Sequence, residues 1–507
     1  MPKLGDIHTA HNARFDRYYA FQFTHYDADE GHAVLLLDWW APTPPCANAL
    51  KDLKPASLDF MDWNGQLELH WVGHGLPRDS VHLGWRSPLV KGEVNREGGW
   101  PDGGGLQRQQ WWNALDPAIT RAYKAELAGD DSDDTLILER DDFVVERGDS
   151  ALQGIAMAAA PSLALFDQMP VLISLDVDVP IPGLLPWLET RPLIDELILS
   201  GIQEPVLDVR RTALSRLSVD VTGMRAIHLN SRLDTLILRG TASPELVIHD
   251  PHEGRWLDVY CTDPDLRWSG LPQLQQITLH GMRRLDATRI AERLPGIRAL
   301  SVQGAPCRLD NSAQLGALAH LEHLSLVDVF PPAEAPFPAP SYWPQLSTLS
   351  LDSVPAELAK AVNASFGPCV ADGLVLEIRQ PRKPEWLAAN MDNPFRDWDD
   401  GAGISAAQAK KAAALYRNAH KEALKSASAP TALAEALQRM ATTYVEGFNA
   451  LNRRSGFIGT SECEQILQAL DTLLDTAEAA QQVKPGGKHM PLDRRPVLEL
   501  VEALRAF

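Results

Sequence analysis

The sequence 233-LDTLILRG-240 places leucines at positions 233, 236 and 238, in the pattern L-x-x-L-x-L. Apolar residues that alternate in this way are typical of a β-strand with one buried face. Related strings recur through the middle of the chain. Aligning them on the second leucine gives nine positions: Leu175, Leu197, Leu217, Leu236, Leu257, Ile277, Leu300, Leu324 and Leu349. Their spacing of 19 to 25 residues predicts a stack of repeats that each contribute one short strand.

From Val171 to Ile378 this pattern resembles the leucine-rich-repeat family. The resemblance implies an α/β fold in which the repeats form a solenoid. The family's usual Asn or Cys, three residues after the last strand leucine, is absent here. Its place is taken by Ile202, Thr222, Thr241, Thr262, Met282, Ala305, Val329 and Val354. Because most of these side chains cannot bond the backbone between turns, we expect an irregular solenoid.

If the strand leucines point inward, the residues between them point outward and form a continuous face. Trp, Tyr and Arg are the residue types enriched in binding hot spots. The face therefore predicts a partner-binding surface made by Arg239, Trp256, Asp258, Tyr260, His280 and His323. The alternative is that the Trp256 side chain packs under a neighbouring loop.

The two ends of the chain differ from the repeats in composition. Residues 1–150 contain eight of the fourteen tryptophans, all before residue 113, and predict a β-containing domain that caps the repeats of residues 151–380. Within this N-terminal domain, 98-GGWPDGGG-105 is expected to be a loop. Residues 381–507 become alanine-rich, and their apolar spacing predicts a helical bundle of four helices within 404–427, 431–454, 461–483 and 494–507.

Two segments of the C-terminal region, 393-NPFRDWDDG-401 and 446-EGFNALNRRSGFI-458, resemble parts of bacterial leucine-rich-repeat proteins, some labelled gliding-motility proteins. A polar site where the two segments meet would be formed by Asn393, Arg396, Asp397, Trp398, Asn449 and Asn452. The alternative role of these residues is structural, with the arginine and the asparagines fixing helix ends.

The sequence motifs considered for metal binding and catalysis do not assign a metal site or a reaction to this chain. His70 and His74 are four residues apart, but the sequence around them reads as a strand followed by a turn, so we expect no metal site and no cofactor. The stretch 171-VLISLDVDVPI-181 resembles the first motif of haloacid-dehalogenase-type phosphatases, with Asp176 as nucleophile and Asp178 as proton donor. Its repeat register favours two outward-facing aspartates on a strand instead.

Charge and composition restrict the class of protein. The net charge of −20 lies almost wholly in the first 385 residues and disfavours nucleic-acid binding. The sequence contains no apolar run of membrane-spanning length and no signal-peptide pattern, and its five cysteines form no C-x-x-C pair, so we expect a cytoplasmic protein of bacterial type. The predicted function is recognition of another protein, as a scaffold, adaptor or inhibitory partner. The alternative is an enzyme of unknown reaction, with its site in the N-terminal domain or in the NPFRDW and GFNALN segments.

Overall fold

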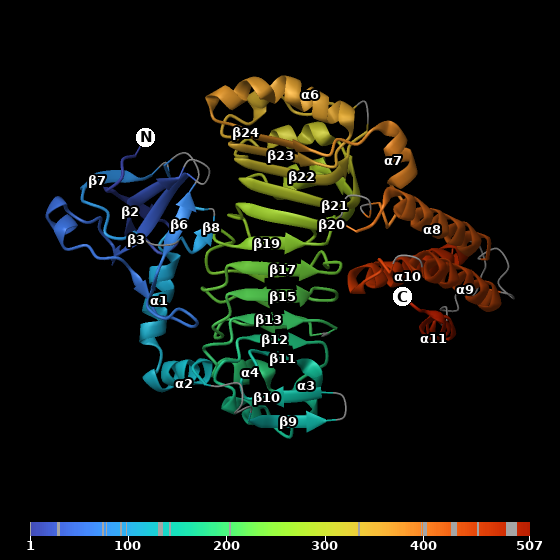
Figure 1. The fold of residues 1–507 in the computed structure, drawn as a ribbon, viewed down its shortest axis with the longest axis horizontal. Coiled ribbons are helices and arrows are strands. Elements are labelled where there is room, and N and C mark those ends of the chain that lie inside the picture. Colours follow the sequence, from blue (N-terminus) through green and yellow to red (C-terminus); the bar gives the residue numbers. More distant parts are fainter. Residues whose placement is uncertain are drawn as a thin grey trace. The chain divides into compact units, whose positions relative to one another are not determined.

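The computed structural model is a mixed α/β structure with a large parallel sheet and a C-terminal helical region (Figure 1). It describes residues 2–27, 31–72, 76–77, 79–91, 94–97, 99–129, 135–140, 143–201, 204–332, 335–396, 398, 403–426, 433–453, 456–482 and 494–507. The chain divides into two compact units. The first comprises residues 1–302, 311–325 and 338–348, and the second comprises residues 303–310, 326–337 and 349–507. No helix in the described ranges has the length and apolar character needed to cross a bilayer.

The N-terminal part of the first unit is a six-stranded sheet in the order β7-β1-β2-β3-β6-β8. Its strands are β1 (Asp6–Asn12), β2 (Arg17–Asp27), β3 (Gly31–Ala41), β6 (Leu69–Val72), β7 (Val81–Trp85) and β8 (Arg96–Glu97). The central strands β2 and β3 are buried on both faces, because one face carries Phe21 and Phe23 and the other carries Ala20. Apolar side chains on successive residues are typical of a strand that is covered on both sides.

The glycine-rich stretch at residues 98–105 does not form only a loop, as the sequence had suggested. Helix α1 (Gly104–Ala114) begins inside it, with Gly103 at its N-cap in the left-handed conformation at φ 80°. Glycine adopts the left-handed conformation without steric cost, which explains the glycine at position 103. Asp102 then accepts a hydrogen bond from the Gly104 amide at 2.7 Å, which satisfies one of the free amides of the first turn.

The large sheet has the order β11-β12-β13-β15-β17-β19-β20-β21-β22-β23-β24. Its strands up to β20 pair in parallel: β11 (Ala151–Gln153), β12 (Ser174–Val177), β13 (Glu196–Leu199), β15 (Arg216–Asp220), β17 (Thr235–Arg239), β19 (Asp258–Cys261) and β20 (Gln276–Asp286). The others are β21 (Ala299–Asp310), β22 (His323–Phe330), β23 (Thr348–Asp352) and β24 (Val375–Arg379). The opening stretch of the sequence forms β17, with Leu236 and Leu238 fully or almost fully buried. A strand of the large sheet at each leucine-containing segment, with alternating burial, was predicted by the leucine pattern.

The repeat that contains Leu257 was placed in the wrong register. Leu236 pairs with Val259, and Leu238 pairs with Cys261, so the buried positions of β19 lie two residues later than the sequence alignment put them. The physical reason is that Val and Cys bury as well as Leu does, and a search for leucines overlooks them. As a result Trp256 lies before β19 and not in its outward-facing row.

A second, three-stranded parallel sheet has the order β14-β16-β18, with β14 (Val206–Asp208), β16 (Ala226–His228) and β18 (Val247–His249). These strands come from the same repeats as β13, β15 and β17, in the return segment after each strand. The short segments between the strands of the large sheet therefore contain strands of their own. Only short apolar stretches around Leu207, Ile227 and Ile248 signal them, and all three side chains are buried.

Buried Asn230 links two successive turns of this region. Its Nδ2 donates to the carbonyl oxygen of Leu214 at 3.0 Å, and its Oδ1 accepts from the amides of Arg232 at 2.7 Å and Leu233 at 2.9 Å. The Asn230 side chain therefore joins backbone groups of the segments before β15 and before β17. It does not follow a strand leucine, which is why the leucine pattern did not reveal it.

The C-terminal helical region contains α7 (Pro384–Asn390), α8 (Ala406–Ser426), α9 (Leu433–Asn452), α10 (Thr460–Gln482) and α11 (Arg495–Leu504). Helices α8, α9 and α11 fall within the ranges that the apolar spacing predicted, and α10 begins one residue before its predicted range. Leu437, Tyr444, Phe448, Leu473 and Leu474 are almost fully buried among them and form one core.

The remaining elements connect these parts. The shorter strands are β4 (Ser57–Leu58), β5 (Gln66–Leu67), β9 (Leu136–Arg140) and β10 (Phe143–Glu146). The other helices are α2 (Pro117–Leu127), α3 (Gly154–Ala159), α4 (Leu184–Leu188), α5 (Ala287–Arg293) and α6 (Ala356–Phe366), with 3-10 turns η1 (Ala47–Lys51), η3 (Leu163–Gln168), η4 (Ser312–Ala317), η5 (Pro340–Tyr342) and η6 (Gly367–Asp372). Asp286 caps α5 by accepting from the Thr288 amide at 2.9 Å.

Candidate functional sites

The outward row of the parallel sheet forms columns in strict register. In parallel strands the paired residues of neighbouring strands lie roughly 4.8 Å apart and point to the same face. The central column runs through Asp176, Ile198, Ser218, Ile237, Tyr260 and Thr278. We call these six residues the central column. All of them are at least partly exposed except Ser218. The column therefore places two isoleucines and a tyrosine on an accessible strip.

A neighbouring column carries charge. It runs through Ser174, Glu196, Arg216, Thr235, Asp258 and Gln276. Arg216 contacts Glu196 with Nε to Oε1 at 3.0 Å. Burial, with the carboxylate of Asp258 beside it, raises the pKa of Tyr260. The Tyr260 hydroxyl therefore stays protonated over the physiological range, and it is hydrogen-bonded to Asp258.

Three of the sequence-predicted binding residues lie on this face, and two lie further along the sheet. Arg239 ends β17, and its Nη2 donates to Ser200 Oγ at 3.1 Å, two strands away. Asp258 and Tyr260 lie in adjacent columns of β19. His280 on β20 and His323, the first residue of β22, are both exposed.

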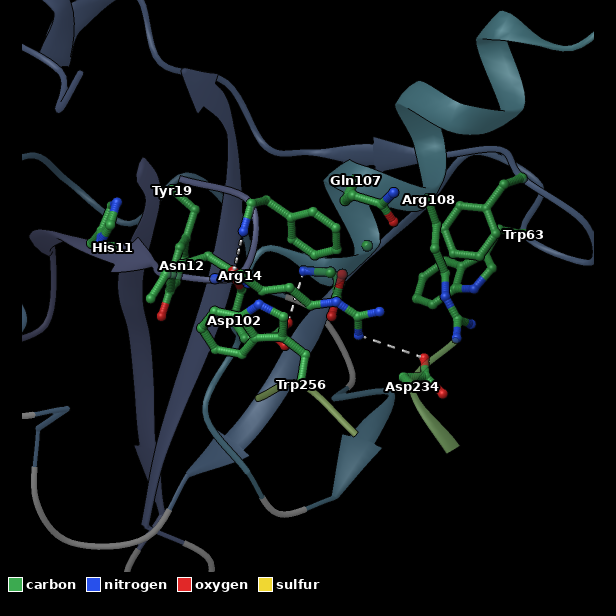
Figure 2. Close-up of a pocket in the computed structure, with 16 residues that line it drawn as sticks. His11, Asn12, Arg14, Tyr19, Trp63, Asp102, Gln107, Arg108, Asp234 and Trp256 are labelled. Atoms are coloured by element: carbon green, nitrogen blue, oxygen red, sulfur yellow. Dashed lines mark hydrogen bonds and ion pairs between the residues drawn. The ribbon is translucent and has the colours of Figure 1, made fainter. Parts of the chain in front are cut away.

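Trp256 belongs to a pocket of 540 Å³, which Figure 2 shows in close-up. The walls come from the segment after β1, the start of α1, and residues just before β17 and β19. Lining residues are His11, Asn12, Ala13, Arg14, Phe15, Tyr19, Phe60, Trp63, Glu68, Asp102, Gly104, Gly105, Gln107, Arg108, Asp234 and Trp256. Acidic groups and guanidinium groups are both present, so the pocket can offer hydrogen-bond donors and acceptors to one ligand.

Arg14 crosses the pocket toward Asp234 (Figure 2). Its Nη2 donates to the carbonyl oxygens of Arg232 at 2.9 Å and Leu233 at 3.2 Å, and its Nη1 lies 4.0 Å from Asp234 Oδ2. Burial lowers the pKa of Arg14 and raises the pKa of Asp234, because desolvation outweighs the attraction between the two charges at this distance. Arginine still keeps its charge at neutral pH.

Glu68 lies at the glycine-rich wall of the same pocket. One carboxylate oxygen, Oε1, is 2.8 Å from Nε2 of His70, and the other, Oε2, is buried and has no hydrogen-bond partner in the described part of the chain. A Cβ atom at Gly105 would lie 2.2 Å from Oε2. Only glycine at this position leaves enough space for the Glu68 carboxylate against the start of α1. His70 contacts Glu68, and His74, four residues further along, lies outside the described residues, so the structure does not place the two histidines together.

The C-terminal segments meet, but through aromatic rings. The Phe395 ring lies 5.3 Å from Phe448 and 4.6 Å from Trp398, between centroids. Trp398 donates from Nε1 to Gln465 Oε1 at 2.7 Å. This contact ties the first segment to α10.

The asparagines of these segments form hydrogen bonds with backbone groups, and the arginine forms an ion pair. Asn393 Oδ1 accepts from the Phe395 amide, Asn449 Nδ2 donates to the Leu504 carbonyl, and Asn452 Oδ1 accepts from the Ile458 amide. Arg396 pairs with Asp328, and Asp397 lies outside the described residues. A 300 Å³ cavity between α8 and α9 is lined by none of these six predicted residues.

Asp176 and Asp178, the residues of the phosphatase-like motif, are both exposed. Asp176 pairs with Gln153 of β11 and with Ile198 of β13, as a residue in the interior of a parallel ladder does. Both aspartates therefore lie at the surface of the repeat sheet.

Sequence reasoning missed most of the pocket. Arg14 and Asp234 meet across more than two hundred residues, and neither belongs to a recognisable motif. Comparisons with protein-family models, with curated proteins and with solved structures gave no match.

Proposed function

We propose that this chain is a recognition protein of the leucine-rich-repeat type, which binds a partner protein on the outward face of its parallel sheet. The observation that carries the proposal is the central column. It places Ile198, Ile237 and Tyr260 in register on one accessible strip. Apolar and aromatic side chains that line up on a rigid surface, with polar residues at its edges, have the composition of an interface centre.

The charges of the face favour a basic partner segment. Both of its arginines already have contacts within the face, Arg216 with Glu196 and Arg239 with Ser200. The acidic side chains Asp176, Asp220 and Asp258 remain at least partly exposed along the same strands. A basic segment with apolar side chains would neutralise these carboxylates and cover the isoleucines, and the strongly acidic chain would attract it over a distance.

The test is capture of partners from cells of the source organism, followed by titration of the purified partner. The test protein is the double variant Ile237→Ser/Tyr260→Ser, whose changes lie on an accessible face and leave the buried leucines in place. The control is Val206→Ser, which changes a 45% exposed valine on β14 in the other sheet of the same unit. We expect at least a tenfold rise in Kd for the double variant and none for the control, because hot-spot truncations cost about 2 kcal/mol or more. Equal Kd values for wild type and double variant would refute the proposal.

The pocket beside Trp256 supports a second candidate, a small-molecule site and with it the enzyme alternative. Its 540 Å³ volume lies in the range of ligand pockets. Arg108, Asp234 and Glu68 all line this pocket, so a small zwitterion would find an oppositely charged side chain for each of its charges. Thermal unfolding in the presence of a set of amino-acid-like zwitterions tests this function. A ligand that stabilises the wild type but not Gly105→Ala or Arg108→Ala would support it, and the absence of any stabilising ligand would count against it.

A further inference from the structure

A second cluster of chemically active side chains lies at the edge of the N-terminal sheet, outside both sites described above. Asp6 and His8 belong to β1, and His82 belongs to β7, the edge strand that pairs with β1. One ligand atom from each of the three residues lies within 4.8 Å of the other two. From this geometry we propose that Asp6, His8 and His82 bind a divalent transition-metal ion, with zinc as the ion to be tested.

The backbone brings these three side chains to one face. Asp6 and His8 are two residues apart on a strand, so their side chains point the same way. His82 lies directly opposite His8 in the antiparallel pairing, and the register shifts between Ile7 and His8, which leaves Leu83 as the extra residue of a β-bulge. Bulges re-aim side chains and are common at functional sites. The irregularity therefore falls at the proposed ligands.

The distances fit a metal centre. Two ligand atoms on a tetrahedral zinc, each about 2.1 Å from the ion, lie about 3.4 Å apart. His82 Nε2 and Asp6 Oδ1 are 3.5 Å apart, longer than a strong hydrogen bond and close to this ligand–ligand separation. All three ligand atoms lie within 4.8 Å of one another, and the exposed His82 side chain is the one that can rotate to shorten this distance to His8. Two imidazoles and a carboxylate are ligands that suit zinc and iron.

His8 adds an independent sign of a missing partner. Its side chain is buried, with 5% of the residue exposed, and its Nδ1 has no hydrogen-bond partner in the described part of the chain. Its ring packs against Phe21 and Phe23 at centroid distances of 5.7 and 5.5 Å. An imidazole fixed by aromatic rings and left with an unsatisfied nitrogen is costly unless it binds something.

The carboxylate is oriented in advance. Asp6 Oδ2 accepts a hydrogen bond from the Lys3 amide at 2.7 Å, which leaves Oδ1 for the histidine side of the cluster. Such supporting contacts hold first-shell ligands in many metal sites. The His82 side chain is 53% exposed, so an ion can enter from solvent. The three protein ligands leave at least one coordination position for water or for a ligand.

The experiment measures zinc binding by the full-length protein after dialysis against a chelator. Titration calorimetry and competition with a chromophoric chelator give stoichiometry and Kd, and Co²⁺ gives visible absorption bands that report a low-symmetry site. The variants are His82→Ala and Asp6→Asn, which change side chains at the edge of the sheet. The control is His320→Ala, an exposed histidine outside the N-terminal sheet.

We expect one zinc ion per wild-type chain, Kd values raised about a hundredfold or more in both variants, and an unchanged Kd in the control. Zinc should also raise the thermal unfolding midpoint of the wild type and not that of His82→Ala. No stoichiometric binding by the wild type, or equal Kd values for wild type, His82→Ala and Asp6→Asn, would overturn the proposal. Circular dichroism of each variant distinguishes loss of the site from loss of the fold. If His82→Ala does not fold, the Kd of Asp6→Asn decides the test, because asparagine keeps the shape of the aspartate side chain.

Discussion

The contacts of Asn230 predict a large loss of stability when its side chain is removed. In Asn230→Ala the amides of Arg232 and Leu233 lose their acceptor, and the carbonyl of Leu214 loses a donor. Asn230 is only 3% exposed, so water cannot replace these partners without opening the turn. Each net hydrogen bond contributes about 1 kcal/mol, and each buried group left unpaired costs about 1–3 kcal/mol. We expect the free energy of unfolding to fall by about 3 kcal/mol, or roughly 150-fold in the folding equilibrium.

Urea unfolding followed by tryptophan fluorescence is a suitable assay. Twelve of the fourteen tryptophans lie in the first unit with Asn230, since only Trp386 and Trp398 lie in the second. The control is Asn113→Ala, which changes an exposed asparagine on α1 in the same unit and should alter stability by less than about 0.5 kcal/mol. If Asn230→Ala also lowers stability by less than about 1 kcal/mol, then the turns do not depend on this side chain and the reasoning fails.

Two further predictions concern charges in each unit. Arg396 and Asp328 form an ion pair in the second unit with 12% of each side chain exposed and Nη2 to Oδ2 at 2.5 Å. Arg396→Ala should therefore destabilise this unit by about 3 kcal/mol, and Arg396→Met/Asp328→Asn should recover part of that loss, both measured by circular dichroism at the helix band during unfolding. In the first unit the Arg210 side chain donates to Asp208 and lowers the pKa of that carboxyl from 3.8 to about 2. The contribution of this contact to the stability of the folded protein is present above pH 3.8 and is lost as the pH falls through about 2. In Arg210→Ala, an NMR titration should find the pKa of Asp208 closer to 3.8. An unchanged pKa of Asp208 would contradict the assignment.

The repeats could be predicted from sequence because the signal is local. Leu197, Leu217 and Leu236 are fully buried, and each is followed two residues later by another buried apolar residue. A period-two pattern fixes which face is inside without knowledge of any distant contact. The prediction was wrong at Leu257, where Val259 and Cys261 occupy the inward positions, because hydrophobic burial does not depend on the identity of the apolar residue.

The candidate sites were largely beyond the sequence, for a physical reason. His8 and His82 are brought together by antiparallel pairing, and Arg14 meets the residues before β17 through tertiary packing. Neither contact has a spacing that repeats along the chain. Of the pocket's lining residues, only Trp256 had been singled out, and it was expected on the strand face. Local sequence patterns predict helices and strands. A site whose side chains come from distant helices and strands can be recognised only when the fold is known.

The contact of Arg14 with the carbonyls of Arg232 and Leu233 has a consequence for the order of events during protein synthesis. The ribosome incorporates Arg14 218 residues before it incorporates the first carbonyl partner, Arg232. At bacterial or eukaryotic elongation rates of about 5–20 residues per second, this delay is roughly 10–45 s. The N-terminal strands can pair within that time, while the Arg14 guanidinium remains hydrated because its carbonyl partners have not yet been synthesised. The last step in building this wall of the pocket is therefore set by translation, and slowing the ribosome between codons 14 and 233 should postpone it in proportion.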